Sequence, residues 1–223
     1  MTNAWLQTTL RRLRHPIITQ RNIRILAAQK LYVLENRLFD YLYNIRTEGN
    51  VEKDQFQTSS PFIHHATRYE PSVCRDIRTL IRTARMQGFN GRSFLDVGCG
   101  VGKACFYASL FHFDRILGVD FEPRLVAKAN HNLKRFRGKR SCIQFLHADA
   151  AELLIPDEKA FIFLFHPFDE NVLNLFLNHN NQRIRQSHSV LGYMNDLHHP
   201  LLKASGMRCT YREEMRKISL WSA

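Results

Sequence analysis

The sequence lacks several features that mark specialised classes of protein. Charged residues interrupt every apolar run, so no stretch is long enough to span a bilayer. The five cysteines are scattered and include no Cys-x-x-Cys pair, which argues against a disulfide framework or a zinc site and favours free thiols in a reducing compartment. Glycine and proline are too sparse to mark a long linker. We therefore expect a cytoplasmic globular protein without a metal site.

Acidic residues are missing from the first 34 positions, which contain five Arg and one Lys. We expect this region to be a helical cap that shapes a substrate pocket. The alternatives are docking on an anionic membrane surface or a partner, which would make the protein peripheral to a membrane, and an organelle transit peptide. The net charge of +12 fits an anionic partner such as nucleic acid, although many soluble proteins are simply basic. The sequence indicates no oligomeric state.

Hydrophobic periodicity divides the 223 residues into two regions. Apolar residues at helical spacing predict helices between residues 5 and 45, interrupted near Pro16, and the polar stretch 47–61 predicts a loop. A further helix is expected from Pro71, placed in its first turn, to Gln87. We therefore predict an N-terminal helical extension and loop over residues 1–60, and a single domain over residues 61–223.

From residue 92 onward, short apolar runs alternate with helical patterns. The predicted strands cover 93–97, 115–121, 142–149, 161–165, 190–195, 209–213 and 218–221, and the predicted helices cover 103–112, 122–136, 171–186 and 199–204. This alternation predicts an α/β fold with a mostly parallel, seven-stranded sheet that has helices on both faces and ends in an antiparallel hairpin.

A glycine-rich turn follows the first predicted strand, in the sequence FLDVGCGVG at residues 94–102. Gly98, Gly100 and Gly102 allow a tight turn and let a ligand lie against bare backbone, beside the partial positive charge of a helix N-terminus. The carboxylate of Asp96 would repel a pyrophosphate, but it can accept a hydrogen bond from an ammonium group, directly or through water. The Gly-x-Gly-x-Gly spacing also differs from the Gly-x-Gly-x-x-Gly of nicotinamide enzymes, which disfavours that class.

Two further acids stand at the ends of predicted strands. Asp120 ends the second strand, 22 residues after Gly98, where a carboxylate can accept both hydroxyls of a ribose. Asp149 ends the third strand, where its carboxylate can accept a hydrogen bond from the amino group of an adenine. Successive parallel strands point their carboxyl ends at one ligand-binding crevice, so we expect these two acids to converge there with Asp96.

Over residues 68–223 these features resemble the class I S-adenosylmethionine-dependent methyltransferases. Asp96 and the three glycines match the first motif of that family, Asp120 matches its ribose-binding acid, and Asp149 matches its adenine-contacting acid. The resemblance implies a Rossmann-like fold, S-adenosylmethionine as the cofactor, and a cofactor site that includes the neighbouring Phe121 and Ala150. It does not name the acceptor, which can be a nitrogen or oxygen atom of a protein, nucleic acid or small molecule. The alternative is a non-catalytic cofactor- or partner-binding protein on the same fold.

A closer resemblance is to a group of small bacterial methyltransferases that open with Tyr-x-Pro and carry Asn-Pro-Phe after the fourth strand. The matching segments are Tyr69-Glu70-Pro71 and residues 166–168, where His166 replaces the Asn. The resemblance implies that Tyr69 closes over the methionine end of the cofactor or meets the substrate. It gives His166 a place beside the acceptor, which this residue can orient or deprotonate. A structural histidine bonded to a loop is the alternative. Because the Asn of amino-methylating relatives holds the target nitrogen, its replacement argues against amino methylation.

Other polar residues are interpreted as structural. Cys99 lies between glycines, where a small residue fits. Lys103 is expected to be a solvated helix residue, and a residue that caps or borders the cofactor loop is the alternative. The histidine pairs at 64–65 and 198–199 lack metal-ligand spacing and are expected at the surface. The basic cluster over residues 134–140 complements a helix C-terminal dipole. Nucleic-acid binding is the alternative for this cluster, and the scarcity of interleaved aromatic residues disfavours it.

Overall fold

The computed structural model describes residues 20–138 and 141–223, with side chains described from residue 31 onward. The chain divides into two units, Met1–Leu34 and Glu35–Ala223. The predicted helix before Pro16 lies outside the described residues, and the predicted domain boundary after residue 60 stays a prediction. Helix α2 (Gln20–Tyr43) begins in the first unit and ends in the second. No helix in the described part of the chain is long and apolar enough to cross a membrane.

Strands and helices alternate along the second unit in the predicted order. The strands are β1 (Ser93–Val97), β2 (Arg115–Asp120), β3 (Cys142–His147), β4 (Ala160–Phe165), β5 (Val190–Met194), β6 (Arg208–Glu213) and β7 (Ile218–Ser222). The helices are α3 (Cys74–Met86), α4 (Lys103–Ala108), α5 (Pro123–Arg135), α6 (Glu170–Gln186) and α7 (His199–Ala204). Two short 3-10 turns, Lys53–Gln55 and Ile63–His65, lie in the loop before α3.

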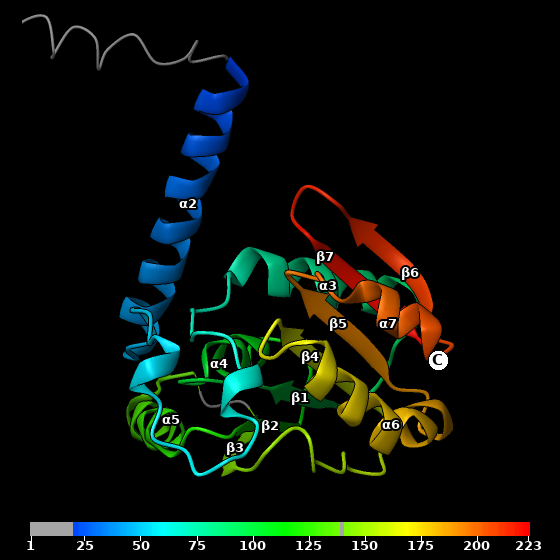
Figure 1. Ribbon diagram of the computed structural model, residues 1–223. Coiled ribbons are helices and arrows are strands. Elements are labelled where there is room, and N and C mark those ends of the chain that lie inside the picture. Colours follow the sequence, from blue (N-terminus) through cyan, green and yellow to red (C-terminus); the bar gives the residue numbers. More distant parts are fainter. Residues whose placement is uncertain (1–19, 139–140) are drawn as a thin grey trace, which may run out of the picture. The chain divides into compact units, whose positions relative to one another are not determined.

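All seven strands form one sheet in the order β3-β2-β1-β4-β5-β7-β6 (Figure 1). The first five strands are parallel, and β7 pairs antiparallel with both β5 and β6. The strand order reverses direction between β1 and β4, which is where open α/β sheets bind their ligands. The predicted Rossmann-like architecture, including its closing antiparallel hairpin, is confirmed.

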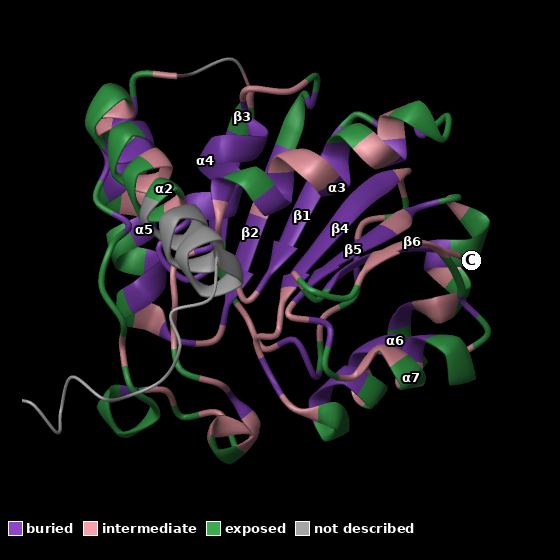
Figure 2. Ribbon diagram, turned by 90° about the horizontal axis from the view of Figure 1, so that it is seen from above, coloured by how far each residue is buried: buried purple, intermediate pink, exposed green. Residues whose placement is uncertain are grey.

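Apolar side chains fill both faces of the sheet, as the alternation along β4 illustrates. Phe161 and Phe163 join the core cluster shared with α3, α4 and α5, whereas Ile162 and Leu164 join the cluster shared with α6 and α7. Figure 2 shows these helices on opposite sides of a buried sheet. Because all four side chains are fully buried, β4 is a central strand with a continuous apolar sequence.

Three predicted boundaries differ from the structure by two residues or more, each for a local reason. Helix α3 begins at Cys74, so Pro71 lies in the extended segment before it. Helix α4 ends at Ala108, because the Ser109 hydroxyl donates to the Phe106 carbonyl and the chain turns there. The pairing of β3 with β2 stops at the Asp120–His147 register, which leaves Asp149 in the loop beyond the strand.

The last turns of α2 belong to the second unit. Phe39 and Asp40 are buried there, and the Phe39 ring contacts the rings of Tyr43 and Tyr107. Leu38 and Leu42, two of the residues that define the predicted helical periodicity, are exposed instead. The packed face of this segment is therefore not the one its leucines suggest.

Candidate functional site

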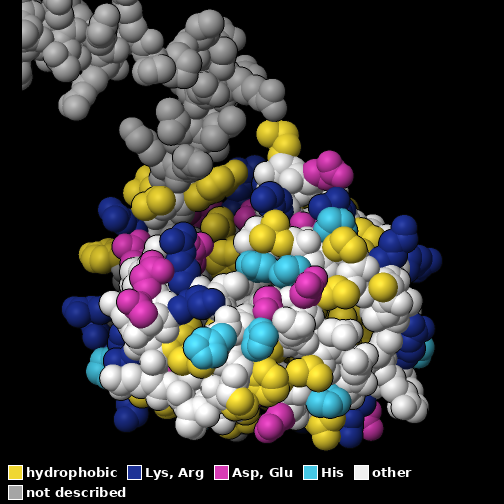
Figure 3. All heavy atoms as spheres, in the orientation of Figure 1, with side chains coloured by type: hydrophobic (Ala, Val, Ile, Leu, Met, Phe, Trp, Pro, Cys, Tyr) yellow, Lys and Arg dark blue, Asp and Glu magenta, His cyan; other side chains and the backbone are white. Residues whose placement is uncertain are grey.

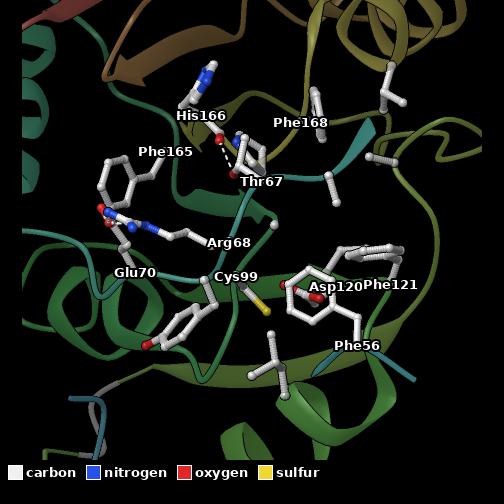
Figure 4. A pocket seen from close by; sticks show the side chains of 18 of the residues that line it. Phe56, Thr67, Arg68, Glu70, Cys99, Asp120, Phe121, Phe165, His166 and Phe168 are labelled. Atoms are coloured by element: carbon white, nitrogen blue, oxygen red, sulfur yellow. Dashed lines mark hydrogen bonds and ion pairs between the residues drawn. The ribbon is translucent and has the colours of Figure 1, made fainter. Parts of the chain in front are cut away.

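A cavity of about 240 Å³ lies at the carboxyl ends of β1, β2 and β4. Its walls come from the turn after β1, the end of β2, the loop after β3, the segment after β4, and the loop over residues 56–72. Figure 4 shows Asp120 near Phe56 and Phe121 at one end and His166 at the other. Histidine, acidic and apolar side chains gather on one face of the molecule (Figure 3).

The glycine turn after β1 has the left-handed backbone that its sequence requires. Gly98, Gly100 and Gly102 have φ values of 83°, 54° and 91°. A Cβ atom on these residues would overlap Pro167, the Tyr69 ring and the Phe145 ring, respectively. Glycine is therefore needed on two grounds, because the backbone is left-handed and because side chains of the protein itself occupy the adjacent space.

Asp120 holds this turn in place. Its Oδ2 accepts from the backbone N–H of Gly100 at 2.8 Å, and its Oδ1 accepts from the N–H of Glu122 at 2.9 Å. Complete burial raises the pKa of this carboxyl to about 6, although the two backbone N–H groups oppose the rise. Each oxygen keeps a second lone pair, so a carboxylate in this position can still accept from two ligand hydroxyls.

The other predicted contacts to an adenosyl group lie along the same wall. Phe121, Asp149 and Ala150 all line the cavity, and the Phe121 ring meets that of Phe56 edge-on at 5.6 Å. The carboxylate of Asp149 accepts from the Ala151 N–H at 2.9 Å and from the Ser60 hydroxyl. Asp149 thus lies in the cavity wall, where a loop from far earlier in the sequence contacts it, and its contact with an adenine stays a prediction.

Asp96 is placed differently from the other two acids. It is 2% exposed, does not belong to the residues that line the cavity, and receives a hydrogen bond from the Cys105 thiol at 3.6 Å. Burial raises its pKa to about 8, so the side chain is mostly protonated at neutral pH. The structure therefore brings Asp120 and Asp149 together at the cavity and leaves Asp96 behind the turn.

Lys103 is buried, so the prediction of a solvated helix residue is wrong. Its ammonium group is 2.5 Å from Asp40 Oδ1 and donates to the Asn36 carbonyl at 3.0 Å. Asp40 also accepts from the backbone N–H of Thr47 at 2.8 Å. This buried ion pair joins the end of α2 to the first residue of α4, directly after the glycine turn.

Tyr69 lines the cavity and covers the glycine turn. Its ring occupies the space beside Gly100, and its hydroxyl donates to the Thr47 carbonyl at 2.8 Å. Burial raises the pKa of this phenol well above its usual range, with nearby Asp40 and Cys99 contributing to the rise. The phenol is therefore a protonated donor held in place by the loop after α2, and its predicted role at the methionine end of the cofactor or at the substrate stays a prediction.

His166 stands at the opposite end of the cavity from Asp120, in a left-handed backbone conformation with φ of 39°. Its Nδ1 lies 3.4 Å from the Tyr193 hydroxyl, and its ring stacks on that of His198 at 5.0 Å. Burial, followed by the neighbouring His198, lowers its pKa below the ordinary value. The imidazole is therefore neutral at pH 7, which is the form that can accept a proton.

Sequence reasoning missed the loop residues that close this end. The Thr67 hydroxyl donates to the His166 carbonyl at 2.6 Å, and the Thr67 N–H donates to the Pro167 carbonyl at 3.0 Å. Ala66 and Phe168 form an antiparallel bridge, and Asn195 adds a polar side chain to the cavity wall. No local pattern indicates these pairings, because the partners are about 100 positions apart in the sequence.

Comparison with known proteins finds similarity to methyltransferases. Residues 94–186 match the family model described as a methyltransferase domain. The 7SK snRNA methylphosphate capping enzyme of Mus musculus is 31% identical over 81 residues, which are 34% of this chain and only 11% of the mouse protein. The chain thus spans about a tenth of the length of this curated relative.

Solved structures show the same fold at low sequence identity. A SAM-dependent methyltransferase from Aquifex aeolicus is 16% identical with a TM-score of 0.50, over 68% of this chain and 98% of the other. The proposed RNA methyltransferase PH1948 of Pyrococcus horikoshii is also 16% identical, with a TM-score of 0.52, over 76% of this chain and 94% of the other. Both cover nearly the whole of the other chain, so the shared region is a complete fold.

Proposed function

We propose that this chain is a class I S-adenosylmethionine-dependent methyltransferase, which transfers a methyl group from that cofactor to a nitrogen or oxygen atom of an RNA acceptor. The observation that carries the proposal is the position of Asp120 in the cavity. This buried carboxylate is bonded to the glycine turn and still has free lone pairs on both oxygens.

The residues present fit the cofactor. Asp120 would accept the two ribose hydroxyls, and the apolar walls formed by Phe121, Leu125 and Ala150 would enclose the adenine. The loop that contains Ser60 closes over Asp149 and would exclude water from this end. When bound, S-adenosylmethionine supplies a sulfonium methyl group that is already electrophilic, so the protein contributes mainly orientation and desolvation.

His166 is the residue we assign to the acceptor. Its neutral imidazole can take a proton from an attacking hydroxyl or orient an attacking nitrogen. The stack on His198 and the contact with Tyr193 fix the ring plane. The Thr67 hydroxyl fixes the backbone of the same residue. Precise approach of the acceptor is what the protein must supply in a reaction of this kind.

The names of similar proteins favour RNA as the class of acceptor. The mouse relative is a methylphosphate capping enzyme of an snRNA, and the Pyrococcus protein is named for RNA methylation. Neither likeness covers enough sequence at sufficient identity to carry over an individual substrate. RNA as a class is consistent with a chain of net charge +12.

The first test is calorimetry of the purified protein with S-adenosylmethionine and S-adenosylhomocysteine. We expect micromolar binding of both ligands, lost in Asp120→Ala and retained in Asp114→Ala, which removes an exposed aspartate before β2. Absence of binding to the folded wild-type protein would overturn the proposal.

The second test identifies the class of molecule that accepts the methyl group. Radiolabelled methyl transfer from S-adenosylmethionine to extracted RNA, and not to protein treated in parallel, is the expected result. Transfer to protein alone would show that the acceptor is a protein and not RNA. Cofactor binding without transfer to RNA, protein or a small-molecule extract would establish a non-catalytic binding protein.

A further inference from the structure

Charge is distributed unevenly over the methyltransferase domain. Residues 123–148, which span α5 and β3, contain seven Lys or Arg and no Asp or Glu. Residues 149–223 contain eight Lys or Arg and nine Asp or Glu, so their charges nearly cancel. The two regions lie at opposite ends of the sheet, since β3 is its first strand and β6 its last (Figure 2).

The cations of α5 form a broad stripe on the exposed side of the helix. Arg124, Lys128 and Lys134 are all exposed, and at 3.6 residues per turn their positions fall within an arc of about 120° around the helix axis. Exposed Arg137 continues the stripe just beyond the helix. In the described part of the chain, only Arg124 of these four forms an ion pair, and its partner is the buried Glu122. The charge of this face is therefore not neutralised by neighbouring acids.

The surface extends to both sides of the helix. Arg46 is exposed, and its backbone N–H donates to Asn132 of α5 at 3.0 Å, which fixes it beside the stripe. On the other side, α5 packs against β3, whose exposed residues include no acid. We refer to Arg46, Arg124, Lys128, Lys134, Arg137 and strand β3 as the α5–β3 surface.

The α5–β3 surface leads directly to the cavity. Phe121 and Leu125 line the cavity, and α5 begins between them at Pro123. The Glu122 side chain caps the helix by accepting from the Arg124 N–H, and it also accepts from the N–H of Gln57 at 2.5 Å. One end of the stripe is therefore held against the loop that encloses the cavity.

We propose that the α5–β3 surface binds the phosphate backbone of an RNA strand and guides that strand to the cavity. The proposal rests on the proposed function, for which RNA is the acceptor. In the described part of the chain, Lys128, Lys134 and Arg137 are exposed and form no ion pair, and such cations suit a polyanion, because each phosphate neutralised releases counterions. A membrane surface fits less well, since the exposed side of α5 carries no large apolar side chain and β3 adds a single exposed leucine, Leu146, which is too little to insert.

The test compares two triple variants with the same change in net charge. Lys128→Glu, Lys134→Glu and Arg137→Glu alter the α5–β3 surface. The matched control changes three exposed cations of α3, α7 and β6, namely Arg82→Glu, Lys203→Glu and Arg208→Glu. The probe is a fluorescein-labelled single-stranded RNA of about 20 nucleotides, titrated by fluorescence anisotropy at several salt concentrations.

We expect the first triple variant to weaken RNA binding at least about 100-fold at low salt and to reduce the salt slope by about 2, because three cations neutralise three phosphates of a single strand. The control variant should stay within about threefold of wild type. Equal weakening of the two variants would overturn the proposal, because net charge alone would then explain binding. Competition by polyglutamate as effective as that by RNA at equal charge would also overturn it, in favour of an acidic protein partner.

Two further measurements separate this proposal from the proposed function. Affinity for S-adenosylhomocysteine should be unchanged in the first triple variant, since none of the three residues lines the cavity. If the wild-type protein binds RNA on this surface but does not bind S-adenosylhomocysteine, the proposed function is wrong, whereas RNA binding by the α5–β3 surface is supported. If thermal unfolding shows that the triple glutamate variant does not fold, a triple variant with Gln at the same three positions is used in its place. An RNA affinity of that variant equal to wild type would then overturn the proposal.

Discussion

The two ends of the cavity are built in different ways. At the end that we propose for the cofactor (the cofactor end), a strand, a glycine turn and a helix follow each other directly in the chain, and Asp120 and Lys103 are both buried. At the end that we propose for the acceptor, His166 is partly exposed and is held by Thr67 and Tyr193, which come from distant segments. One end is therefore a continuous motif with buried charges, whereas the other is an assembly of loops. Substitutions should therefore affect folding at the first end and turnover at the second.

The largest effect is expected at the buried ion pair of the cofactor end. Lys103→Met leaves Asp40 charged and unpaired inside the protein, which should lower the free energy of unfolding by about 3–5 kcal/mol. Chemical denaturation measures this loss. Arg92→Met, which breaks the exposed pair with Asp114, is the matched control and should cost less than about 1 kcal/mol.

A double variant tests the cause of that loss. Asp40→Asn removes the stranded charge but keeps an acceptor for Thr47, so Lys103→Met with Asp40→Asn should be more stable than Lys103→Met alone. Simple addition of the two single losses would show that the pair does not act as a unit.

Asp120→Ala should produce the next largest effect, in cofactor affinity. Loss of a charged acceptor for two hydroxyls costs about 1.5–3 kcal/mol for each hydrogen bond, so the Kd of S-adenosylhomocysteine should rise at least about 100-fold. Calorimetry with Asp114→Ala as the control measures this. Affinity within threefold of wild type would mean that the ribose does not bind at Asp120.

His166→Asn should separate the two ends of the cavity. Asn tolerates the left-handed backbone of this position, so folding should be retained. We expect kcat to fall about 10- to 100-fold, with affinity for S-adenosylhomocysteine unchanged. His188→Asn is the matched control, because His188 is an exposed histidine with φ of 53° outside the cavity. Equal kcat values in the two variants would make His166 a structural residue.

The last effect is expected at Asp96 and depends on pH. Its pKa is about 8 in the folded protein and about 3.9 when unfolded, so between these values the folded chain keeps a proton that the unfolded chain releases. The stabilisation is complete below about pH 4 and is lost as the pH rises through about 8. Asp96→Asn should therefore gain stability relative to wild type as the pH rises, so that the difference between their free energies of unfolding is larger near pH 9 than near pH 5 by at least about 1.4 kcal/mol. A difference that does not vary with pH would contradict this explanation.

The sequence was sufficient where neighbouring residues determine the geometry. Local pattern predicts the glycine turn, because a tight turn after a buried strand needs glycine. It also predicts the order of strands and helices along the chain. Asp120 is then expected beside the glycine turn, because parallel strands point their carboxyl ends to the same edge of the sheet. The burial of Lys103 was not predictable, since its partner Asp40 lies 63 positions earlier on another helix. The left-handed conformation of His166 was not predictable either, because the Thr67 hydroxyl that donates to its carbonyl comes from a distant part of the chain.

Strand β3 has a consequence for the behaviour of the protein in solution. As the outermost strand of the described sheet, it leaves one row of backbone N–H and C=O groups unpaired by any other strand, and such an edge can pair with the same edge of a second molecule. Two copies that meet there would bring together two acid-free surfaces of the same sign, which repel each other over about 8 Å at physiological ionic strength. Protection against edge-to-edge aggregation should therefore weaken as salt is added.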